Sequence, residues 1–474
     1  MTKIIATIGP SSDSEELIKK LILNGVNIFR FNMKHNVKEW HVERINRVNT
    51  VAKELRLNIG ILIDLQGPEI RIETFEAKDI EVNTDDTIVF CSDFDSGALK
   101  KLDVSYRKIR VSHPLVCETL KRGDRFSIDN GMVEFIVESA GENYFIAKSR
   151  DTGIINTRKG LNLLGVDIAL PSLIDEDLDK LDVATLAKVD FIALSFVRTP
   201  EDVMTLKQEM SQRTISAKII SKVESQKGVD NIDAIIDASD GIMIARGDLG
   251  VEVPLEQVTH IQKEIIKKCR SKCKPVIVAT QMLESMIDRP RPTRAEAADV
   301  ANAVYDGTDA VMLSGESATG KYPVKAVEVM RKILKYNEGR THSLDISIIK
   351  AVDYTQSIVS AAMNILNTEK FHEIHKIIVF TETGYTARVL SSFRPNIPVV
   401  ALSNNLNTVE SLSLNYGIVS FYYDFPEGFF SIPAELSIDL KKRGIVKENE
   451  TVIILHGSKW RDPGKTNALL ITRI

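Results

Sequence analysis

The stretch AKIISKVESQKG, residues 217–228, begins as a buried strand and ends in charged residues. Alanine, isoleucine and valine dominate its first part, which is typical of a strand inside a sheet. Lys222 and Glu224 stand two positions apart, and side chains at this spacing project from the same face of a strand. A solvated ion pair at a strand end is the common reason for such a pair. The neighbouring sequence decides between that interpretation and a functional site.

Similar apolar runs recur along the chain, and most are separated by amphipathic segments of helix length. The eight predicted strands cover residues 3–9, 27–33, 59–65, 191–196, 217–224, 241–246, 275–280 and 310–315. Alternation of strands and helices favours a parallel sheet, and eight such units are the number in a TIM (β/α)8 barrel. We therefore predict an α/β protein with a TIM barrel at its centre.

Two other segments of this 474-residue chain depart from the barrel pattern. Residues 71–170 alternate short strands with Gly and Asp turns, which predicts an all-β domain inserted in a barrel loop. Residues 338–474 contain a second set of strands and helices, which predicts a C-terminal α/β domain with an open sheet. The barrel is then built from residues 1–70 and 171–337.

The composition is that of an ordinary globular enzyme, with 27% charged residues and a net charge of -4. It gives no reason to expect nucleic acid or a membrane surface as a partner. No apolar run approaches the roughly 20 residues of a membrane span, and the first residues do not resemble a targeting leader. Cys269 and Cys273 have no further Cys or His nearby, so reduced thiols are favoured over a metal site. A cytoplasmic location is expected.

Polar side chains follow nearly every predicted barrel strand. The carboxyl ends of the strands meet at one mouth of a TIM barrel, where the chemistry lies. So many charged groups in one place indicate a charged ligand. The polar residues at these ends are Arg30, Asn32, Asp64, Ser195, Arg198, Lys222, Glu224, Arg246, Asp248, Thr280, Ser314 and Glu316.

The residue types at this mouth indicate phosphoryl transfer. Glu224 and Asp248 follow neighbouring strands and suit a hard divalent cation, Mg²⁺ or Mn²⁺. Lys222 and Arg30 add positive charge where a phosphoryl group would lie. The segment ARGDLGVEVP, residues 245–254, predicts a short helix whose free amides suit an anionic carboxylate. A metal, a cationic clamp and an amide cradle together are typical of phosphoryl transfer.

A second phosphate motif is incomplete. GESATGK, residues 315–321, has the spacing of a P-loop, but Tyr322 stands where that motif needs Ser or Thr for magnesium. It also follows the eighth barrel strand rather than the first strand of an open sheet. We therefore do not predict a P-loop nucleotide site.

Long segments of the chain resemble the pyruvate kinase family over almost its whole length. The most specific are KIIATIGPSS (3–12), RFNMKHN (30–36), IISKVES (219–225), IMIARGDLGVEVP (242–254), RPTRAEAADVANAVYDGTDAVMLSGESATGKYP (291–323) and WRDPGKTN (460–467). The resemblance implies a barrel with an inserted β lid and a C-terminal α/β domain. It also implies conversion of phosphoenolpyruvate and ADP to pyruvate and ATP.

The resemblance also implies roles for individual residues. The substrate and catalytic residues would be Arg30, Lys222, Gly247, Asp248, Thr280 and Ser314, with Thr280 and Ser314 near the enolate that is protonated. The metal ligands would be Glu224 and Asp248. The nucleotide side would comprise Asn32, His35, Arg71 and Lys159, the last supplied by the lid.

The chain departs from the family at Lys34, where a serine usually helps to hold potassium with the equivalents of Asn32, Asp64 and Leu65. An ammonium group cannot ligate a cation and repels one. Lys34 either replaces the ion beside Asp64 or pairs with an acid such as Glu69, and we favour replacement. Glu69 argues against replacement of the ion, because potassium-dependent members of the family carry glutamate at this position.

The C-terminal domain contains FTETGYTAR, residues 380–388, a turn suited to a phosphate. The resemblance predicts a sugar-phosphate effector there, with WRDPGK (460–465) as a second contact loop, although a capped strand-to-helix turn explains the threonines equally well. The effector residues would be Thr381, Thr383, Gly384 and Thr386. The family is usually a homotetramer. A metal-dependent lyase or aldolase and a catalytically silent sensor stay as alternatives.

Overall fold

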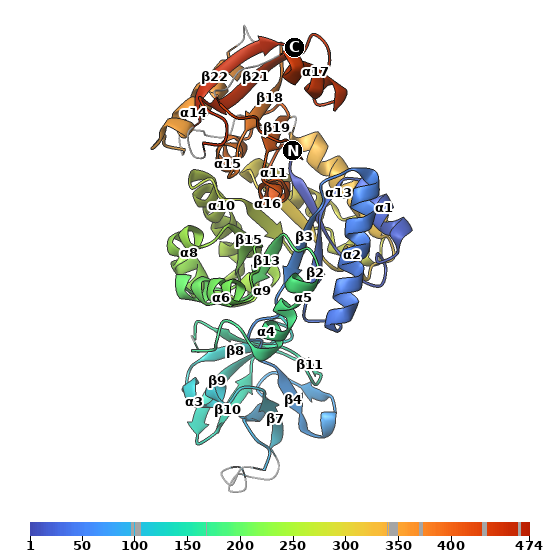
Figure 1. Cartoon of the computed structure of the whole chain (residues 1–474). Coiled ribbons are helices and arrows are strands. Elements are labelled where there is room, and N and C mark those ends of the chain that lie inside the picture. Colours follow the sequence, from blue (N-terminus) through green and yellow to red (C-terminus); the bar gives the residue numbers. More distant parts are fainter. Residues whose placement is uncertain are drawn as a thin grey trace.

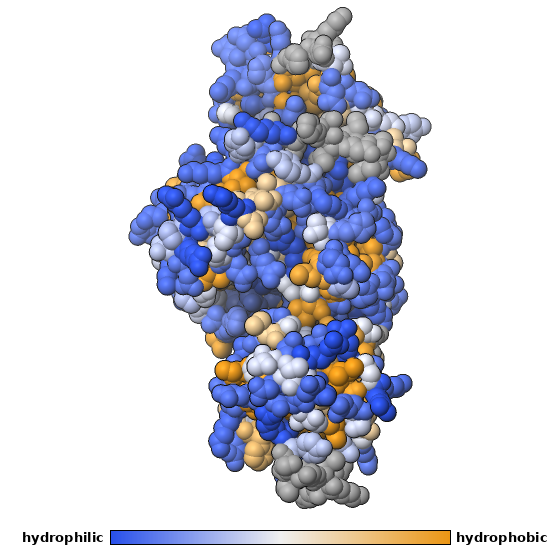
Figure 2. Space-filling view, turned by 180° about the vertical axis from the view of Figure 1, so that it is seen from behind, coloured by the Kyte–Doolittle hydropathy of each residue, from blue (hydrophilic) through white to orange (hydrophobic). Residues whose placement is uncertain are grey.

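A computed structural model gives the structure of residues 1–95, 99, 106–166, 168–338, 340, 349–368, 373–428, 434–462 and 466–474. Three parts lie along the long axis of the molecule, with the barrel between the inserted domain and the C-terminal domain (Figure 1). Figure 2 shows the molecule from behind, where hydrophilic residues cover most of the surface of all three parts.

The central part is a closed barrel of eight parallel strands, which confirms the predicted TIM barrel. Its strands are β1 (Lys3–Thr7), β2 (Val26–Asn32), β3 (Gly60–Asp64), β13 (Phe191–Leu194), β14 (Lys218–Val223), β15 (Gly241–Ala245), β16 (Val276–Ala279) and β17 (Ala310–Leu313). The helices that follow in this part are α1 (Glu15–Leu23), α2 (Lys38–Leu55), α4 (Asp175–Leu181), α5 (Val183–Leu186), α6 (Pro200–Gln212), α7 (Gln226–Asp230), α8 (Ile232–Ala238), α9 (Arg246–Glu252), α10 (Leu255–Ser271), α11 (Arg294–Asp306), α12 (Gly315–Ala318) and α13 (Pro323–Glu338).

Strand β14 shows how alternation positions the charged residues. Ile219 packs in the core between barrel and helices, whereas Ile220 packs in a separate cluster with residues from the other barrel strands. Alternate side chains of a barrel strand point inward, so Lys222 continues the inward row that Ile220 begins. The row reaches the carboxyl end of the strand, and a lysine is therefore held inside the barrel mouth.

Several predicted strands end earlier in the structure than in the sequence analysis. The strands predicted to reach residues 196 and 280 end at Leu194 and Ala279. Phe196 and Thr280 adopt positive φ angles of 53° and 67°, which no extended strand can contain. The chain turns sharply at both positions, at the edge of the mouth where strained backbone often marks a functional site.

The inserted domain is built mainly from antiparallel strands. A seven-stranded sheet has the order β12-β8-β9-β10-β6-β7-β4, and β5 and β11 form a second pair. Its elements are β4 (Ile72–Thr74), β5 (Ile80–Val82), β6 (Thr87–Cys91), β7 (Arg107–Val111), α3 (Leu115–Thr119), β8 (Arg125–Ile128), β9 (Val133–Gly141), β10 (Tyr144–Ser149), β11 (Gly153–Ile155) and β12 (Leu161–Leu164). Apart from the short helix α3, this agrees with the predicted all-β lid.

The C-terminal domain has an open five-stranded sheet, as predicted, in the order β20-β19-β18-β21-β22. Its elements are α14 (Tyr354–Leu366), β18 (Ile374–Phe380), α15 (Tyr385–Ser392), β19 (Val399–Ser403), α16 (Leu406–Ser411), β20 (Ile418–Tyr422), α17 (Ala434–Lys442), β21 (Thr451–Gly457) and β22 (Thr466–Arg473). The predicted boundaries between the three parts stay predictions. None of the helices in the described residues is long and apolar enough to span a membrane.

Candidate active site

A cavity of about 520 Å³ lies between the barrel mouth and the inserted domain. Both parts of the molecule contribute to its wall, the insert through residues such as Asn130, Gly160 and Asn162. The predicted site residues that line this cavity are Arg30, Asn32, Lys34, Asp64, Leu65, Ser195, Lys222, Glu224 and Asp248. The structure therefore brings these residues together around one cavity.

Lys222 lies at the centre of the buried charges. Its Nζ is 2.9 Å from Glu224 Oε1 and 3.2 Å from Asp64 Oδ1, and it donates a hydrogen bond of 2.7 Å to Ser195 Oγ. Burial alone would lower the pKa of Lys222, but the charges of Asp64, Glu224 and Asp248 outweigh it and raise the pKa above its ordinary value. The lysine is therefore a permanent cation in the cavity.

Glu224 is almost fully buried, with 1% of the residue exposed, and two donors hold its carboxylate. One oxygen faces Lys222, and the other accepts a 2.6 Å hydrogen bond from the backbone N–H of Phe196. Burial, together with the charge of Asp248, raises the pKa of Glu224 to about 7 against the opposing effect of Lys222. A buried carboxylate with a second acid nearby is stabilised by a bound cation.

Asp64 links the lysine to an arginine. Arg30 Nε donates a 2.7 Å hydrogen bond to Asp64 Oδ2, and Arg30 Nη1 donates to Thr7 Oγ1 at 3.1 Å. Burial alone would raise the pKa of Asp64, but the charges of Lys222 and Arg30 lower it below its ordinary value. Asp64 therefore stays ionised and fixes both cations at one end of the cavity.

Asp248 stands in the first turn of α9, the short helix that the sequence predicts after β15. The backbone N–H of Gly247 donates to Thr280 Oγ1 at 2.7 Å, and that hydroxyl donates to the carbonyl of Ala279 at 2.6 Å. The guanidinium of Arg246 donates to the carbonyl of Thr280 at 2.7 Å and pairs with Asp299. These contacts hold the turn at Thr280 against the start of α9.

Glu252 is a cavity residue that the sequence analysis missed. It lies one helical turn after Asp248 on α9 and lines the same wall. Burial and the charge of Asp248 raise its pKa to about 8. The spacing of four residues on a predicted helix was the signal that places both acids on one face.

Lys34 pairs with Glu69, which is the arrangement that the sequence analysis did not favour. Its Nζ is 2.7 Å from Glu69 Oε2, and Arg71 Nη2 is 3.0 Å from the same oxygen. The side chains of Lys34 and Glu69 are 32% and 23% exposed and both belong to the cavity wall. Leu65 contributes its carbonyl oxygen, which accepts a 2.7 Å hydrogen bond from Ser195 Oγ.

Some of the predicted residues lie outside the lining of this cavity. Lys159 pairs with Asp129 of the same domain, with Nζ 2.9 Å from Oδ2. The backbone N–H of Ser314 donates to Glu316 Oε2 at 2.8 Å. The full set outside the lining is His35, Arg71, Lys159, Gly247, Thr280 and Ser314.

The predicted effector turn borders a second, smaller cavity of about 40 Å³ in the C-terminal domain. Gly384 has a φ of 77°, and its N–H donates to Thr381 Oγ1 at 3.0 Å. Thr383 and Thr386 also line this cavity, as do residues 460–462 of the WRDPGK loop. Residues 463–465 of that loop lie outside the described part of the chain.

The donor set of the large cavity fits a hard divalent cation. Glu224 and Asp248 offer carboxylate oxygens, and Mg²⁺ commonly takes one or two carboxylates and fills its other positions with water and substrate. No cluster of three or more His, Cys, Asp or Glu suited to a metal occurs among the residues that the structure describes. Lys321 of the incomplete P-loop pairs with Asp288 on the surface.

Comparison with known proteins agrees with this architecture. A family model described as "Pyruvate kinase, barrel domain" matches residues 1–327, and one described as "Pyruvate kinase, alpha/beta domain" matches residues 356–472. Pyruvate kinase of Bacillus licheniformis is 38% identical over 477 residues, covering 99% of this chain and 80% of that protein. Pyruvate kinase of Clostridium perfringens is 38% identical over 490 residues, covering 100% and 99%. Pyruvate kinase of Trypanoplasma borreli is 38% identical over 472 residues, covering 96% and 91%. The chain therefore belongs to the pyruvate kinase family.

Proposed function

We propose that this cavity transfers the phosphoryl group of phosphoenolpyruvate to ADP, giving pyruvate and ATP in glycolysis. Membership of the family makes the protein a phosphotransferase. The observation that carries the assignment to this cavity is the position of Lys222, buried beside Asp64 and Glu224 between barrel and lid. A cation fixed in a dry site stabilises the charge that develops on a phosphoryl group in flight.

The two fixed cations have complementary roles in the proposal. Lys222 stabilises the phosphoryl group between donor and acceptor oxygens, while Arg30 binds the phosphate of the substrate. Asp64 orients both, because it contacts both side chains. The geometry is set before the substrate binds, so little reorganisation is needed during the reaction.

The family depends on a divalent cation and, in general, on a monovalent one. We assign Mg²⁺ or Mn²⁺ to Glu224 and Asp248, the carboxylates that share the cavity. The bound ion would supply positive charge to the carboxylate and phosphate of the substrate.

The residues at the α9 turn are assigned to the rest of the substrate. The amides of Gly247 and Asp248 are assigned to its carboxylate, and the Gly247 amide, which donates to Thr280 Oγ1 in this structure, would exchange that partner for the substrate. Thr280 and Ser314 are the groups proposed to deliver the proton to the enolate, with ordered water as the carrier. The hydroxyl of Thr280 is held by Ala279 and Gly247, so its position is defined.

The nucleotide is assigned to the lid side of the cavity, with Asn32, His35, Arg71 and Lys159. Asn32 lines the cavity, and Arg71 adjoins Glu69 on its wall. Lys159 and Arg71 belong to paired segments of the lid, since Arg71 and Gly160 form a β-bridge. A basic side chain on the lid places positive charge on the ADP phosphates.

For the monovalent cation, we propose that the charge of Lys34 replaces potassium. The candidate ligands already have donors, because Asp64 accepts from Arg30 and Leu65 O accepts from Ser195. The ammonium of Lys34 pairs with Glu69 on the cavity wall, and its side chain is 32% exposed. It therefore neutralises an acid of the wall where an alkali cation would otherwise be attracted.

The proposed oligomeric state and effector are those that the resemblance to the family implies. We propose a cytoplasmic homotetramer that binds a sugar phosphate at Thr381, Thr383, Gly384 and Thr386. Titration of fructose bisphosphate, glucose 6-phosphate and ribose 5-phosphate should shift the apparent affinity for phosphoenolpyruvate with at least one of them. The shift should disappear in Thr383→Val, which changes an exposed hydroxyl of the turn, and persist in the control Thr368→Val, two residues after the end of α14. No shift with any of the three would reject the effector site.

The reaction itself is tested by measuring pyruvate and ATP together. Purified protein with phosphoenolpyruvate, magnesium and ADP should form both products in equal amounts, and omission of ADP should stop both. Release of a carbonyl product without ADP would favour a lyase or aldolase. No turnover with intact metal binding would favour a silent sensor.

A further inference from the structure

The segment SFVR, residues 195–198, joins the buried charges of the cavity to the chain that returns from the lid. Ser195 Oγ accepts a hydrogen bond from Lys222 Nζ, and the N–H of Phe196 donates to Glu224 Oε2. The N–H of Val197 donates to the carbonyl of Lys222 at 3.3 Å. Three consecutive residues of one turn therefore contact Lys222, near the end of β14, and Glu224, just beyond it.

Arg198, the next residue, holds the lid linker. Its Nη1 donates to the carbonyl of Ile168 at 2.7 Å, and its Nη2 donates to the carbonyl of Leu170. The side chain is only 16% exposed, and Arg198, Ile168 and Leu170 all line the cavity. Two parallel bonds from one guanidinium to two backbone carbonyls fix the linker in both position and direction.

The backbone of Arg198 is itself fixed to the barrel. Its N–H donates to Asp202 Oδ2 at 2.8 Å, and its carbonyl accepts from Asn231 Nδ2 at 2.9 Å. The linker entering the lid is held at a different place, where the N–H groups of Gln66 and Gly67 donate to the buried Asp177. Of the two linkers, it is the one held by Arg198 that is attached to the segment contacting Lys222 and Glu224.

We propose that Arg198 is a positioning residue that couples the seating of the lid to the placement of Lys222 and Glu224. A shift of the linker would move the guanidinium of Arg198 and, through it, the preceding turn. Phe196 in this turn has a strained positive φ of 53°, which only the contacts around it can maintain. Relaxation of this turn moves the Phe196 N–H away from Glu224. This inference rests on the proposed roles of Lys222 and Glu224 in the reaction.

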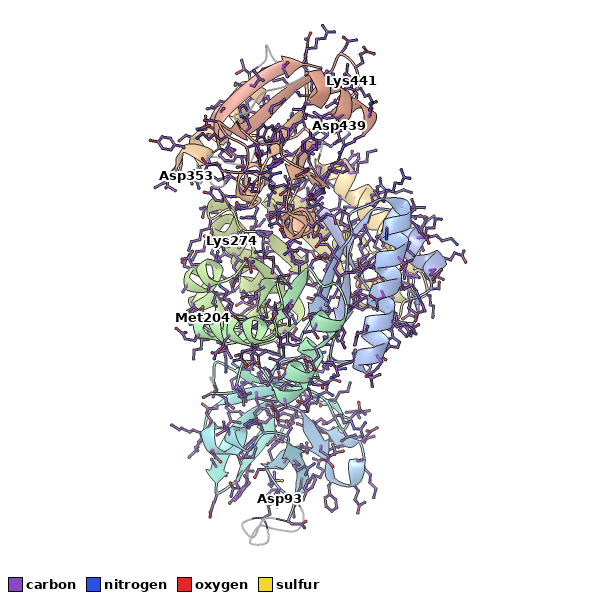
Figure 3. All side chains as sticks on the ribbon, in the orientation of Figure 1. Asp93, Met204, Lys274, Asp353, Asp439 and Lys441 are labelled. Carbon is purple, nitrogen blue, oxygen red and sulfur yellow. The ribbon has the colours of Figure 1, made fainter. Side chains whose placement is uncertain are left out.

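The test compares Arg198→Met, Arg198→Lys and a control, Arg213→Met. Met keeps the apolar stem and removes both hydrogen bonds, while Lys keeps the charge but carries its N–H donors on a single nitrogen and lacks the planar fork of arginine. Arg213 directly follows α6, the helix that begins two residues after Arg198. Figure 3 labels Met204 of this helix, which lies on the side of the barrel. Arg213 pairs with Glu209 and Asp182 and is 25% exposed.

Three measurements are made on the full-length protein: hydrogen exchange of the backbone amides of residues 168–170, 172 and 173, Mn²⁺ affinity without nucleotide by water-proton relaxation, and kcat at saturating substrates. Arg198→Met should speed exchange in the linker, weaken Mn²⁺ binding about tenfold and lower kcat on the order of tenfold to a hundredfold. Arg198→Lys should lie between Arg198→Met and wild type, and Arg213→Met should match wild type.

A purely structural role for Arg198 predicts a different result. Faster linker exchange with unchanged Mn²⁺ affinity and kcat would overturn the proposal, as would equal behaviour of Arg198→Met and Arg213→Met. If Arg198→Met does not fold, Arg198→Lys carries the test, and wild-type values for it would overturn the coupling. The exchange and Mn²⁺ measurements need no turnover, so they decide this inference even if the wild-type protein forms no ATP.

Discussion

The ammonium of Lys222 lies 2.9 Å from the carboxylate of Glu224, and the two side chains are 12% and 1% exposed at the barrel mouth. The two residues belong to the same face of β14 and its continuation, so the strand itself sets their spacing. The Phe196 N–H and Ser195 Oγ fix the pair from the neighbouring strand end. A solvated ion pair at a strand end has none of this support, and the pair is instead a preorganised part of the cavity.

Glu224→Gln should raise the magnesium concentration needed for half-maximal activity at least about tenfold, because the amide cannot supply the negative charge of the ligand. Asp248→Asn should behave in the same way. Magnesium titration of initial rates measures both. Asp230→Asn is the control, since Asp230 is an exposed acid on the cavity wall that accepts a hydrogen bond from Gln226. Unchanged magnesium dependence in both Glu224→Gln and Asp248→Asn would remove these residues from the metal site.

Wild-type activity should be similar in a buffer whose only monovalent cation is tetramethylammonium and in the same buffer with potassium chloride at equal ionic strength. Lys34→Ser should become dependent on potassium, because removing the ammonium takes away one of the two cations that pair with Glu69 and leaves Arg71 alone there. Lys38→Ser, at the start of α2, is the control and should not respond. Strong potassium activation of the wild type would reject the replacement of potassium by Lys34.

The sequence predicts the inward row of β14 and the polar strand ends because strand alternation and the convergence of barrel strands are general geometric rules. It does not predict the Phe196 amide as a partner of Glu224, since a positive φ at phenylalanine has no signal in composition. The choice of Glu69 as the partner of Lys34 also depends on how the lid linker leaves the barrel. Contacts between segments far apart in the chain need the tertiary structure.

The same limit applies to the lid. Lys159 is predicted for the nucleotide side, and the structure pairs it with Asp129, a residue of a neighbouring turn. The pairing of lid strands sets this contact, and no local pattern identifies it. Arg198, in contrast, was visible as a polar strand end, but its two carbonyl partners at Ile168 and Leu170 were not.

Arg394→Met should lower the free energy of unfolding by about 3–5 kcal/mol, because it leaves a buried acid without its partner. Arg394 Nη2 lies 2.7 Å from Asp309 Oδ2, and the two side chains are 5% and 3% exposed. This pair joins the C-terminal domain to the start of β17. Urea unfolding measures the change. Lys20→Met breaks an exposed pair with Glu16 and should leave the midpoint unchanged. Equal midpoints for both variants would contradict a stabilising role of the buried pair.

The most direct test of the proposed reaction is the kcat of Lys222→Met for ATP formation from phosphoenolpyruvate and ADP, with phosphoenolpyruvate binding measured separately by calorimetry. Lys218→Met changes a lysine of the same strand that pairs with Asp240 outside the cavity, and it serves as the control. We predict that kcat of Lys222→Met falls about 10³-fold or more while binding stays measurable, because its charge is needed most when the phosphoryl group is between oxygens. Turnover near that of wild type and Lys218→Met would contradict the central role of Lys222.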